Sequence, residues 1–242
     1  MADTNNTKNT NNAKEKTAKK KPSILFKVNK KGLHVSSCIS FLRTCILPFV
    51  RLCYPFRYFG NKKVKDGACI YVSNHYKMID PMYILPTTKE GIHFIAKNDS
   101  KKFPILGPFI TGAKTIYVGR DGTDARAIMD ALKCLKSGDK VAIYPEGTRN
   151  KSDQPFLPFK SGSALLAIRA QVPIVPMVVY QKARFFRRND IIIGEPFELS
   201  EYYGKKMTEE LLKEADGKIL AVMEGLREKH KQMLEEKKGK KN

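Results

Sequence analysis

Residues 68–81 read ACIYVSNHYKMIDP, an apolar run followed by a short polar segment and a proline. The run 68–73 is short and rich in β-branched and aromatic residues, which is typical of a buried strand. Pro81 suits the first turn of a helix, where a backbone N–H has no partner to lose. The stretch therefore predicts a strand, a tight polar connection that carries His75, and a helix that begins near Pro81.

The same alternation of apolar runs and amphipathic segments continues along the chain. Further strands are predicted at 92–96, 115–118, 140–144, 174–180 and 191–194. Helices are predicted at 124–136 and 161–170, and a long amphipathic helix at 207–235 is expected to pack on the sheet. Thr123 and Gly138 are typical residues for the start and end of the first of these helices. Strands that alternate with helices predict an α/β fold with a mostly parallel sheet covered by helices.

The chain is strongly basic and has the length of one large α/β domain. Its 242 residues include 45 Lys and Arg against 24 acidic residues, a net charge of +21. Residues 1–32 carry nine Lys and two acidic residues, and we predict a disordered basic tail there and a second basic tail at 237–242. A helical segment at 33–60 and an α/β domain at 61–236 complete the predicted organisation. The surplus charge favours an anionic partner, which can be a membrane surface, a nucleic acid or a phosphorylated ligand.

Residues 33–60 predict an amphipathic helical segment at a membrane interface. Apolar residues recur with helical spacing from Val35 to Cys53, and the segment 33–60 as a whole contains three Arg and no acidic residue. Pro48 and Pro55 are expected to kink or end helices. A wide apolar face with only cationic charge suits an anionic bilayer surface, and the adjoining basic tail favours this interpretation. An ordinary pair of helices that faces the core explains the same stripe.

Cysteine usage and hydropathy indicate the redox compartment of the protein and how it relates to membranes. The five cysteines form no CxxC pair, which argues against a zinc or disulfide framework and favours a reducing compartment. No run of about 18 uncharged apolar residues is present, so we expect no simple transmembrane helix. Residues 1–21 have no apolar core, and we expect no secretory signal. We predict a membrane-associated protein, peripheral or monotopic, on the cytoplasmic face.

His75 and Asp80 are candidate catalytic residues at the end of the first predicted strand. Open α/β sheets place their sites at the carboxyl ends of strands, where His75 is expected. Five residues from strand end to helix can bring Asp80 back beside the imidazole. The carboxylate would fix one tautomer of the ring, and the other nitrogen would take a proton from a hydroxyl. A structural histidine beside a helix-capping Asp is the alternative.

A second candidate site follows the strand 140–144, where residues 144–149 read YPEGTR. Gly147 allows close approach of the backbone, Thr148 adds a hydroxyl, and Arg149 offers a planar fork for a phosphate. A turn with a surface Arg is the alternative. Arg120 follows another strand and is a weaker candidate for an anion contact.

In chain order, these blocks resemble the signature of the glycerolipid acyltransferase family, which includes the 1-acyl-glycerol-3-phosphate acyltransferases. The matching elements are NHx4D at 74–80, a strand followed by Arg120, YPEGTR at 144–149 and VPIVP at 172–176. Tyr144 stands where the family has Phe. The resemblance covers about 68–180.

The resemblance implies a function and a site. His75 would be the general base on the free hydroxyl of a lysophospholipid, and Asp80 would orient it. The hydroxyl would attack the thioester of acyl-CoA or acyl-carrier protein directly, without an acyl-enzyme. The phosphate of lysophosphatidic acid would be bound in a site formed by Arg149, Arg120 and Lys97, together with Glu146, Gly147 and Thr148; Lys160 is a weaker candidate. No cofactor and no metal are implied.

Two other interpretations stay open. Another acceptor, such as glycerol-3-phosphate or a different lysophospholipid, would use the same chemistry. A basic nucleic-acid-binding module fits the charge, but the sequence contains no RNA-binding aromatic signature, helix-turn-helix or zinc finger. We therefore expect lysophosphatidic acid, an acyl thioester and an anionic membrane as partners, and no nucleic acid.

Overall fold

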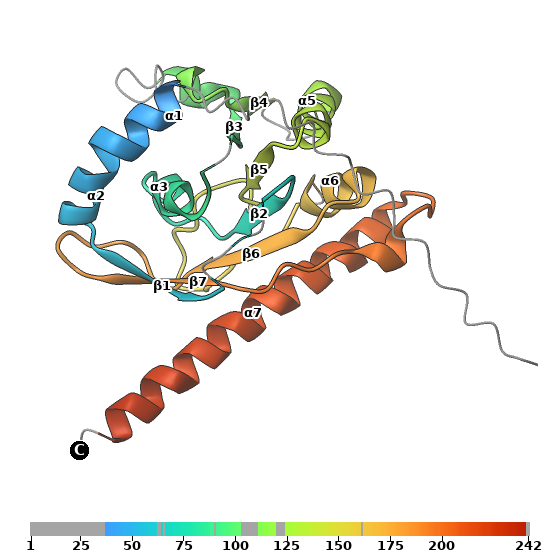
Figure 1. The fold of residues 1–242 in the computed structure, drawn as a ribbon. Helices are drawn as coiled ribbons and strands as arrows, with labels where there is room; N and C mark the ends of the chain where they lie inside the picture. The colour runs from blue at the N-terminus through green and yellow to red at the C-terminus, as the bar shows by residue number, and fades with distance from the viewer. Residues whose placement is uncertain are drawn as a thin grey trace, which may run out of the picture.

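A seven-stranded sheet forms the centre of the molecule (Figure 1). The computed structural model describes residues 37–61, 64, 66–89, 91–102, 111–119, 124–160 and 162–240. The strands lie in the order β1-β7-β6-β2-β5-β3-β4. They are β1 (Phe56–Gly60), β2 (Ile70–Ser73), β3 (Ile92–Lys97), β4 (Ile116–Val118), β5 (Lys140–Ile143), β6 (Ile174–Val179) and β7 (Asn189–Ile193).

The sheet is mostly parallel, and this sets which strand ends meet. Five of the six neighbouring pairs are parallel, and only β6 and β7 pair antiparallel. The six strands predicted from the sequence are all present, with ends that differ by at most two residues. The α/β fold with a mostly parallel sheet is therefore confirmed.

Helices cover both faces of the sheet (Figure 1). One face packs against α5 (Ala125–Lys136), α6 (Gly162–Ala170) and α7 (Glu209–Gly239), with Ile70 and Val72 of β2 in that core. The other face packs against α1 (Ser37–Phe41) and α3 (Pro81–Ile84), with Cys69 and Tyr71 in its core. Because successive side chains of a strand point to opposite faces, the short run 69–72 supplies both cores.

The N-terminal segment differs from its prediction at its C-terminal end. Residues 33–36 lie outside the described residues, as does the predicted tail 1–32. We expected 33–60 to be helical, but Phe56–Gly60 forms the edge strand β1, paired in parallel with β7. Pro55 precedes this strand, and a residue before proline is biased away from helix.

The helical part of this segment forms one continuous rod that contains a single π-helical turn. After α1 comes a π-helical turn, η1 (Leu42–Ile46), and then α2 (Leu47–Cys53), with Pro48 in the first turn of α2. Proline lacks the N–H and clashes with the carbonyl four residues before it, and a π-helical turn relieves this clash. One side of the rod packs on the protein through Ile39, while Phe49 and Leu52 are 65% and 68% exposed.

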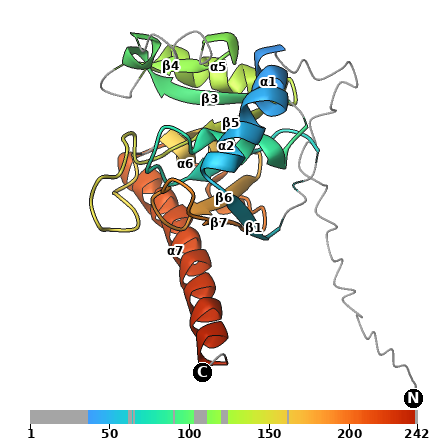
Figure 2. The ribbon, with the colours of Figure 1, turned by 90° about the vertical axis from the view of Figure 1, so that its left-hand side faces the viewer.

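The remaining helices follow the predicted pattern with shifted ends. Asp124 caps α5 by accepting a hydrogen bond from the Arg126 backbone N–H at 2.9 Å, whereas the predicted cap, Thr123, lies outside the described residues. Helix α7 runs four residues beyond the predicted 235, so part of the predicted tail 237–242 is helical. Its C-terminal turns extend past the sheet in both views (Figures 1 and 2). Among the described residues, no helix has the length and hydropathy to cross a membrane.

Candidate active site

The candidate residues gather at one edge of the sheet because their strands are parallel. Strand β5 pairs in parallel with β2 on one side and with β3 on the other. The carboxyl ends of all three strands therefore lie at the same edge. His75 follows β2, the YPEGTR loop follows β5, and Lys97 is the last residue of β3.

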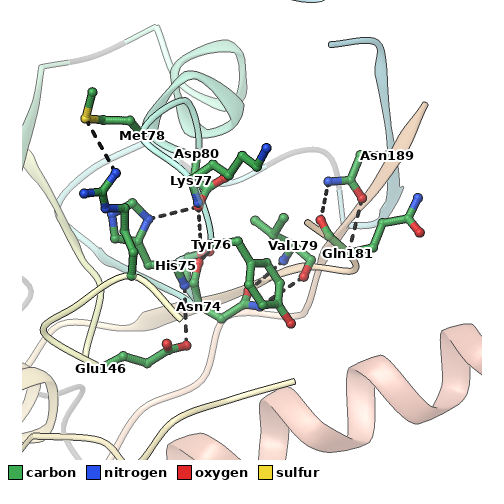
Figure 3. Close-up of polar contacts among 12 residues, drawn as sticks. Asn74, His75, Tyr76, Lys77, Met78, Asp80, Glu146, Val179, Gln181 and Asn189 are labelled. Atoms are coloured by element: carbon green, nitrogen blue, oxygen red, sulfur yellow. Dashed lines mark hydrogen bonds and ion pairs between the residues drawn. The ribbon is translucent and has the colours of Figure 1, made fainter. Parts of the chain in front are cut away.

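His75 and Asp80 form a hydrogen-bonded pair at this edge (Figure 3). The distance from His75 Nδ1 to Asp80 Oδ2 is 2.9 Å. The same oxygen accepts hydrogen bonds from the backbone N–H groups of Tyr76 and Lys77, each at 2.7 Å. The Asp80 side chain is completely buried, whereas that of His75 is 19% exposed. The tight loop thus returns the carboxylate to the imidazole, as the spacing predicts.

This geometry determines which ring nitrogen is available for chemistry. Asp80 Oδ2 accepts hydrogen bonds from two backbone N–H groups, so we assign it as an acceptor from His75 as well, with the ring proton on Nδ1. In the neutral ring, Nε2 then has a free lone pair and can take a proton from a hydroxyl. The buried carboxylate also stabilises the imidazolium that results.

The plane of the imidazole is set by Tyr144, the residue directly after β5. The two rings are stacked with their centroids 4.3 Å apart and an interplanar angle of 25°. Burial raises the pKa of the Tyr144 hydroxyl well above its usual range, so this group stays protonated. Tyr144 thus contacts the imidazole of His75 with the face of its ring.

Two asparagines hold the loops of the site in place. The side chain of Asn74 binds both backbone groups of Val179 at the end of β6: its Oδ1 accepts from the N–H at 2.8 Å, and its Nδ2 donates to the carbonyl at 3.0 Å. The Asn150 backbone N–H donates to the His75 carbonyl at 2.6 Å. The Asn150 side chain also closes its own loop by donating to the Gln154 carbonyl at 2.8 Å. Sequence analysis gave Asn150 no role, and only its place after YPEGTR could have drawn attention to it.

Glu146 is a buried acid beside the His75 loop. Its Oε1 accepts a long hydrogen bond from the His75 backbone N–H at 3.4 Å, and its Oε2 has no partner among the described residues. Burial raises the pKa of Glu146 to about 8. The side chain is therefore mostly neutral at pH 7, in spite of its place in a basic site.

Gly147 gives the YPEGTR loop its shape. Its φ of +62° lies in the left-handed region, which glycine adopts without a steric penalty. The loop is tied back by the Lys160 N–H, which donates to the Pro145 carbonyl at 2.8 Å. The alkyl part of the Lys160 side chain lies against Gly147, where it leaves little room for a Cβ atom.

The predicted phosphate ligands differ in how the structure places them. Arg149 and Thr148 are exposed on the loop, and Arg149 Nη1 lies 4.0 Å from Sδ of Met78, a residue of the loop that carries His75. Lys97 is exposed at the end of β3. Arg120 lies outside the described residues. The structure thus brings His75, Asp80, Glu146 and Arg149 together, with Lys97 two strands away at the same edge.

The chain is similar to curated 1-acyl-sn-glycerol-3-phosphate acyltransferases over about half of its length. The chain is 33% identical over 124 residues to a 1-acyl-sn-glycerol-3-phosphate acyltransferase of Helicobacter pylori, over 50% of this chain and 52% of that protein. It is 36% identical over 124 residues to human 1-acyl-sn-glycerol-3-phosphate acyltransferase beta, over 49% of this chain and 43% of that protein. The match spans about half the length of these curated relatives.

A solved structure extends the similarity to most of the chain. The crystal structure of the 1-acyl-sn-glycerophosphate (LPA) acyltransferase PlsC from Thermotoga maritima matches with a TM-score of 0.57 and 26% identity. The match covers 80% of this chain and 79% of that one. A family model described as Acyltransferase matches residues 56–180, about half of the chain, from β1 through the His75 loop and YPEGTR to the end of β6. This chain therefore belongs to the Acyltransferase family.

Proposed function

We propose that the protein transfers a fatty acyl group from an acyl thioester to the free hydroxyl of 1-acyl-glycerol-3-phosphate, which yields phosphatidic acid. The observation that carries the proposal is the His75–Asp80 pair, with its 2.9 Å hydrogen bond and the partly exposed imidazole. The relatives named above support the choice of acceptor.

The proposed reaction needs one base and no covalent enzyme intermediate. The acceptor hydroxyl gives its proton to Nε2 of His75 as its oxygen attacks the thioester carbonyl. The tetrahedral intermediate collapses, the new ester forms, and the carbon–sulfur bond breaks. The imidazolium of His75 then returns the proton to the leaving thiolate. Asp80 stabilises the imidazolium between these two steps.

The phosphate of the acceptor is proposed to bind at the loop after β5. Arg149 supplies a bidentate guanidinium there, Lys97 and Arg120 add positive charge, and Thr148 adds a hydroxyl. Gly147 shapes the loop. Glu146 is compatible with a nearby phosphate because its raised pKa keeps it mostly neutral at pH 7.

We also propose that the protein is attached peripherally to the cytoplasmic face of a membrane through α1 and α2. Phe41, Phe49 and Leu52 are exposed on this rod. Arg43 does not serve as a free headgroup ligand, because its side chain donates to the Leu85 and Lys89 carbonyls at 3.1 and 3.2 Å. Arg51 lies on the same rod with its guanidinium 5.1 Å from the centroid of the Phe56 ring.

The test is acyl transfer to lysophosphatidic acid in mixed micelles, with acyl-CoA and acyl-carrier protein offered in parallel. We expect phosphatidic acid from the wild type with one or both donors. The His75→Ala variant should lose activity by a factor of at least about 100, the usual contribution of a general base. Circular dichroism of the variant checks that it is folded.

Two outcomes would count against parts of the proposal. Turnover by folded His75→Ala would remove the general base. Acylation of glycerol-3-phosphate or of another lysophospholipid in place of lysophosphatidic acid would keep the chemistry and change the acceptor.

A further inference from the structure

The hairpin between β6 and β7 ends in two exposed phenylalanines. The Arg187 N–H donates to the Arg184 carbonyl at 3.1 Å, which closes a turn with Phe185 and Phe186 at its two central positions. The two side chains are 56% and 65% exposed. Large apolar residues at the tip of a turn are unusual, since Gly, Pro, Asn, Asp and Ser dominate such positions.

The backbone conformation at position 186 makes a phenylalanine there still less favourable for folding. Its φ is +53°, in the left-handed region, at the position where a type II turn favours glycine or asparagine. A bulky residue there is strained, and strain of this kind persists at functional positions. The turn therefore disfavours an aromatic residue at this site, and the ring contact given for Phe186 is with its neighbour Phe185, with centroids 4.2 Å apart.

The charges around the tip point to an anionic partner. Residues 181–189 read QKARFFRRN, with four basic residues and no acidic one. Arg184, Arg187 and Arg188 are all exposed and flank the two rings directly. Aromatic rings bordered by arginines match the chemistry of a membrane interface, where rings enter the headgroup region and guanidinium groups bind lipid phosphates.

The tip is held against the end of α2. The Phe186 N–H donates to the Cys53 carbonyl at 2.7 Å, and the Phe185 ring meets Tyr54 edge-on with centroids 5.4 Å apart. Figure 1 shows this loop beside the lower end of α2. The tip thus lies beside the C-terminal end of α2, the helix that carries the exposed Phe49 and Leu52.

The topology places the tip at the edge of the sheet that carries the candidate active site. Strand β6 runs parallel to β2, with Ser73 opposite Met177, so the chain leaves β6 at the His75 edge. Strand β1 begins opposite Asn189 at the same edge, and α2 ends there. A membrane that contacts the tip and α2 therefore lies on the side from which a lipid acceptor would reach His75.

We propose that residues 184–188 form a second membrane-inserting element, in which the rings of Phe185 and Phe186 enter an anionic bilayer and the three arginines bind lipid phosphates. The proposal rests on the proposed function, which requires a membrane-borne acceptor. A second copy of this chain is a poorer occupant, because the arginines of two tips would repel each other. A two-residue tip is also small compared with the roughly 800 Å² per partner of a stable protein interface.

The absence of tryptophan from the sequence allows a direct test. Phe186→Trp places a single fluorophore at the tip of the full chain, and vesicles of phosphatidylcholine and phosphatidylglycerol serve as the membrane. We expect the emission to move to shorter wavelength on addition of these vesicles and to be quenched by brominated lipids. The matched control is Met129→Trp on α5, a 53% exposed residue on the other face of the sheet, whose emission should not change.

A second variant separates membrane contact from folding. Phe186→Gly removes the strain at positive φ, so we expect a higher melting temperature together with at least about tenfold weaker vesicle binding, since burial of a Phe side chain in an apolar phase is lost. A fall in both the melting temperature and the affinity for vesicles would show that Phe186 stabilises the fold, and it would overturn the proposal.

Two further results would overturn it. Emission of the Phe186→Trp variant that stays unchanged with vesicles would leave the tip in water. A shift that depends on protein concentration without lipid would identify a second copy as the occupant. Neither measurement uses substrate, so failure of the acyltransferase proposal would appear separately, as a lack of product in the micelle assay.

Discussion

The ring of Tyr144 orients His75, whereas its buried hydroxyl lowers the stability of the folded protein. The ring stacks on His75, but the hydroxyl is buried and has no hydrogen-bond partner among the described residues. A buried polar group without a partner costs about 1–3 kcal/mol. Phe keeps the ring and removes the hydroxyl, so Tyr144→Phe is the substitution that separates the two effects.

We expect Tyr144→Phe to stabilise the protein and to leave the reaction intact. The free energy of unfolding should rise by about 1 kcal/mol, because the unsatisfied hydroxyl is removed and the stacked ring is kept. Urea denaturation measures the first effect and micelle kinetics the second. A less stable variant would contradict this account of the hydroxyl, and a tenfold loss of kcat would assign it a part in the reaction.

Arg149 is exposed, and its proposed partner is the acceptor phosphate. Arg149→Ala should raise the KM for lysophosphatidic acid by about 10- to 100-fold, because a hydrogen bond between charged groups is lost. The KM for the acyl donor should change little. Arg169→Ala, an exposed arginine at the end of α6, is the matched control. Equal shifts for donor and acceptor would mean that Arg149 supports the loop and does not bind the phosphate.

His93 joins three elements at the far edge of the sheet. It lies in β3, its Nδ1 is 3.0 Å from the Lys114 carbonyl before β4, and its Nε2 is 3.1 Å from Asp139 Oδ2 before β5. Both partners only accept hydrogen bonds, so both ring nitrogens donate and the ring is an imidazolium. The hydrogen bond to Asp139 is the main cause that raises the pKa of His93 to about 10.

This pKa predicts how stability changes with pH. The folded value of about 10 lies above the ordinary value of 6.5, so the contribution of His93 is complete below pH 6.5 and disappears as the pH rises through 10. We expect His93→Gln to lower the free energy of unfolding by about 1–3 kcal/mol at pH 6, and the difference from wild type to shrink toward pH 10. Urea denaturation of both proteins from pH 6 to 10 measures it. A constant difference across this range would show that His93 contributes by packing alone.

The whole molecule combines a large positive charge with an apolar surface at one edge. Five of the exposed large apolar residues in the described part of the chain lie on α1, α2 and the β6–β7 tip: Phe41, Phe49, Leu52, Phe185 and Phe186. The net charge of +21 would draw the protein to an anionic surface, and the apolar residues would then enter it. Attraction of this kind is screened by salt, whereas insertion of apolar side chains is not.

Vesicle binding should therefore depend on salt and on the N-terminal tail. We expect binding to anionic vesicles to weaken at least tenfold between about 0.05 and 0.5 M NaCl, as the Debye length falls. A chain that lacks residues 1–32 loses a net charge of +7 and should bind more weakly with a smaller salt dependence. Sedimentation with vesicles measures both, and phosphatidylcholine vesicles are the control. Binding that is unaffected by salt would contradict an electrostatic contribution.

Six of the seven strands and the His75–Asp80 pair were predicted correctly because their signals are local. The apolar run of β2 is recognisable without knowledge of its partners, and His75 and Asp80 are five residues apart in one tight loop. Strand β1 was missed because its residues FRYFG show no clear alternation. Its partner β7 lies more than 130 residues away, and the ion pair of Arg57 with Asp190, at 2.7 Å, forms only in that pairing.

The amino-acid sequence alone therefore specified the strand–loop–helix unit around His75, the contact of His75 with Asp80 and the α/β class, since hydrophobic period and short-range spacing are properties of neighbouring residues. Only the tertiary structure placed the ring of Tyr144 on His75, the N–H of Asn150 on the His75 carbonyl and the Phe185–Phe186 tip beside α2. Each of these contacts joins residues that are about 70 or more positions apart. Burial and pairing at such separations depend on the packing of the whole chain, which no local pattern contains.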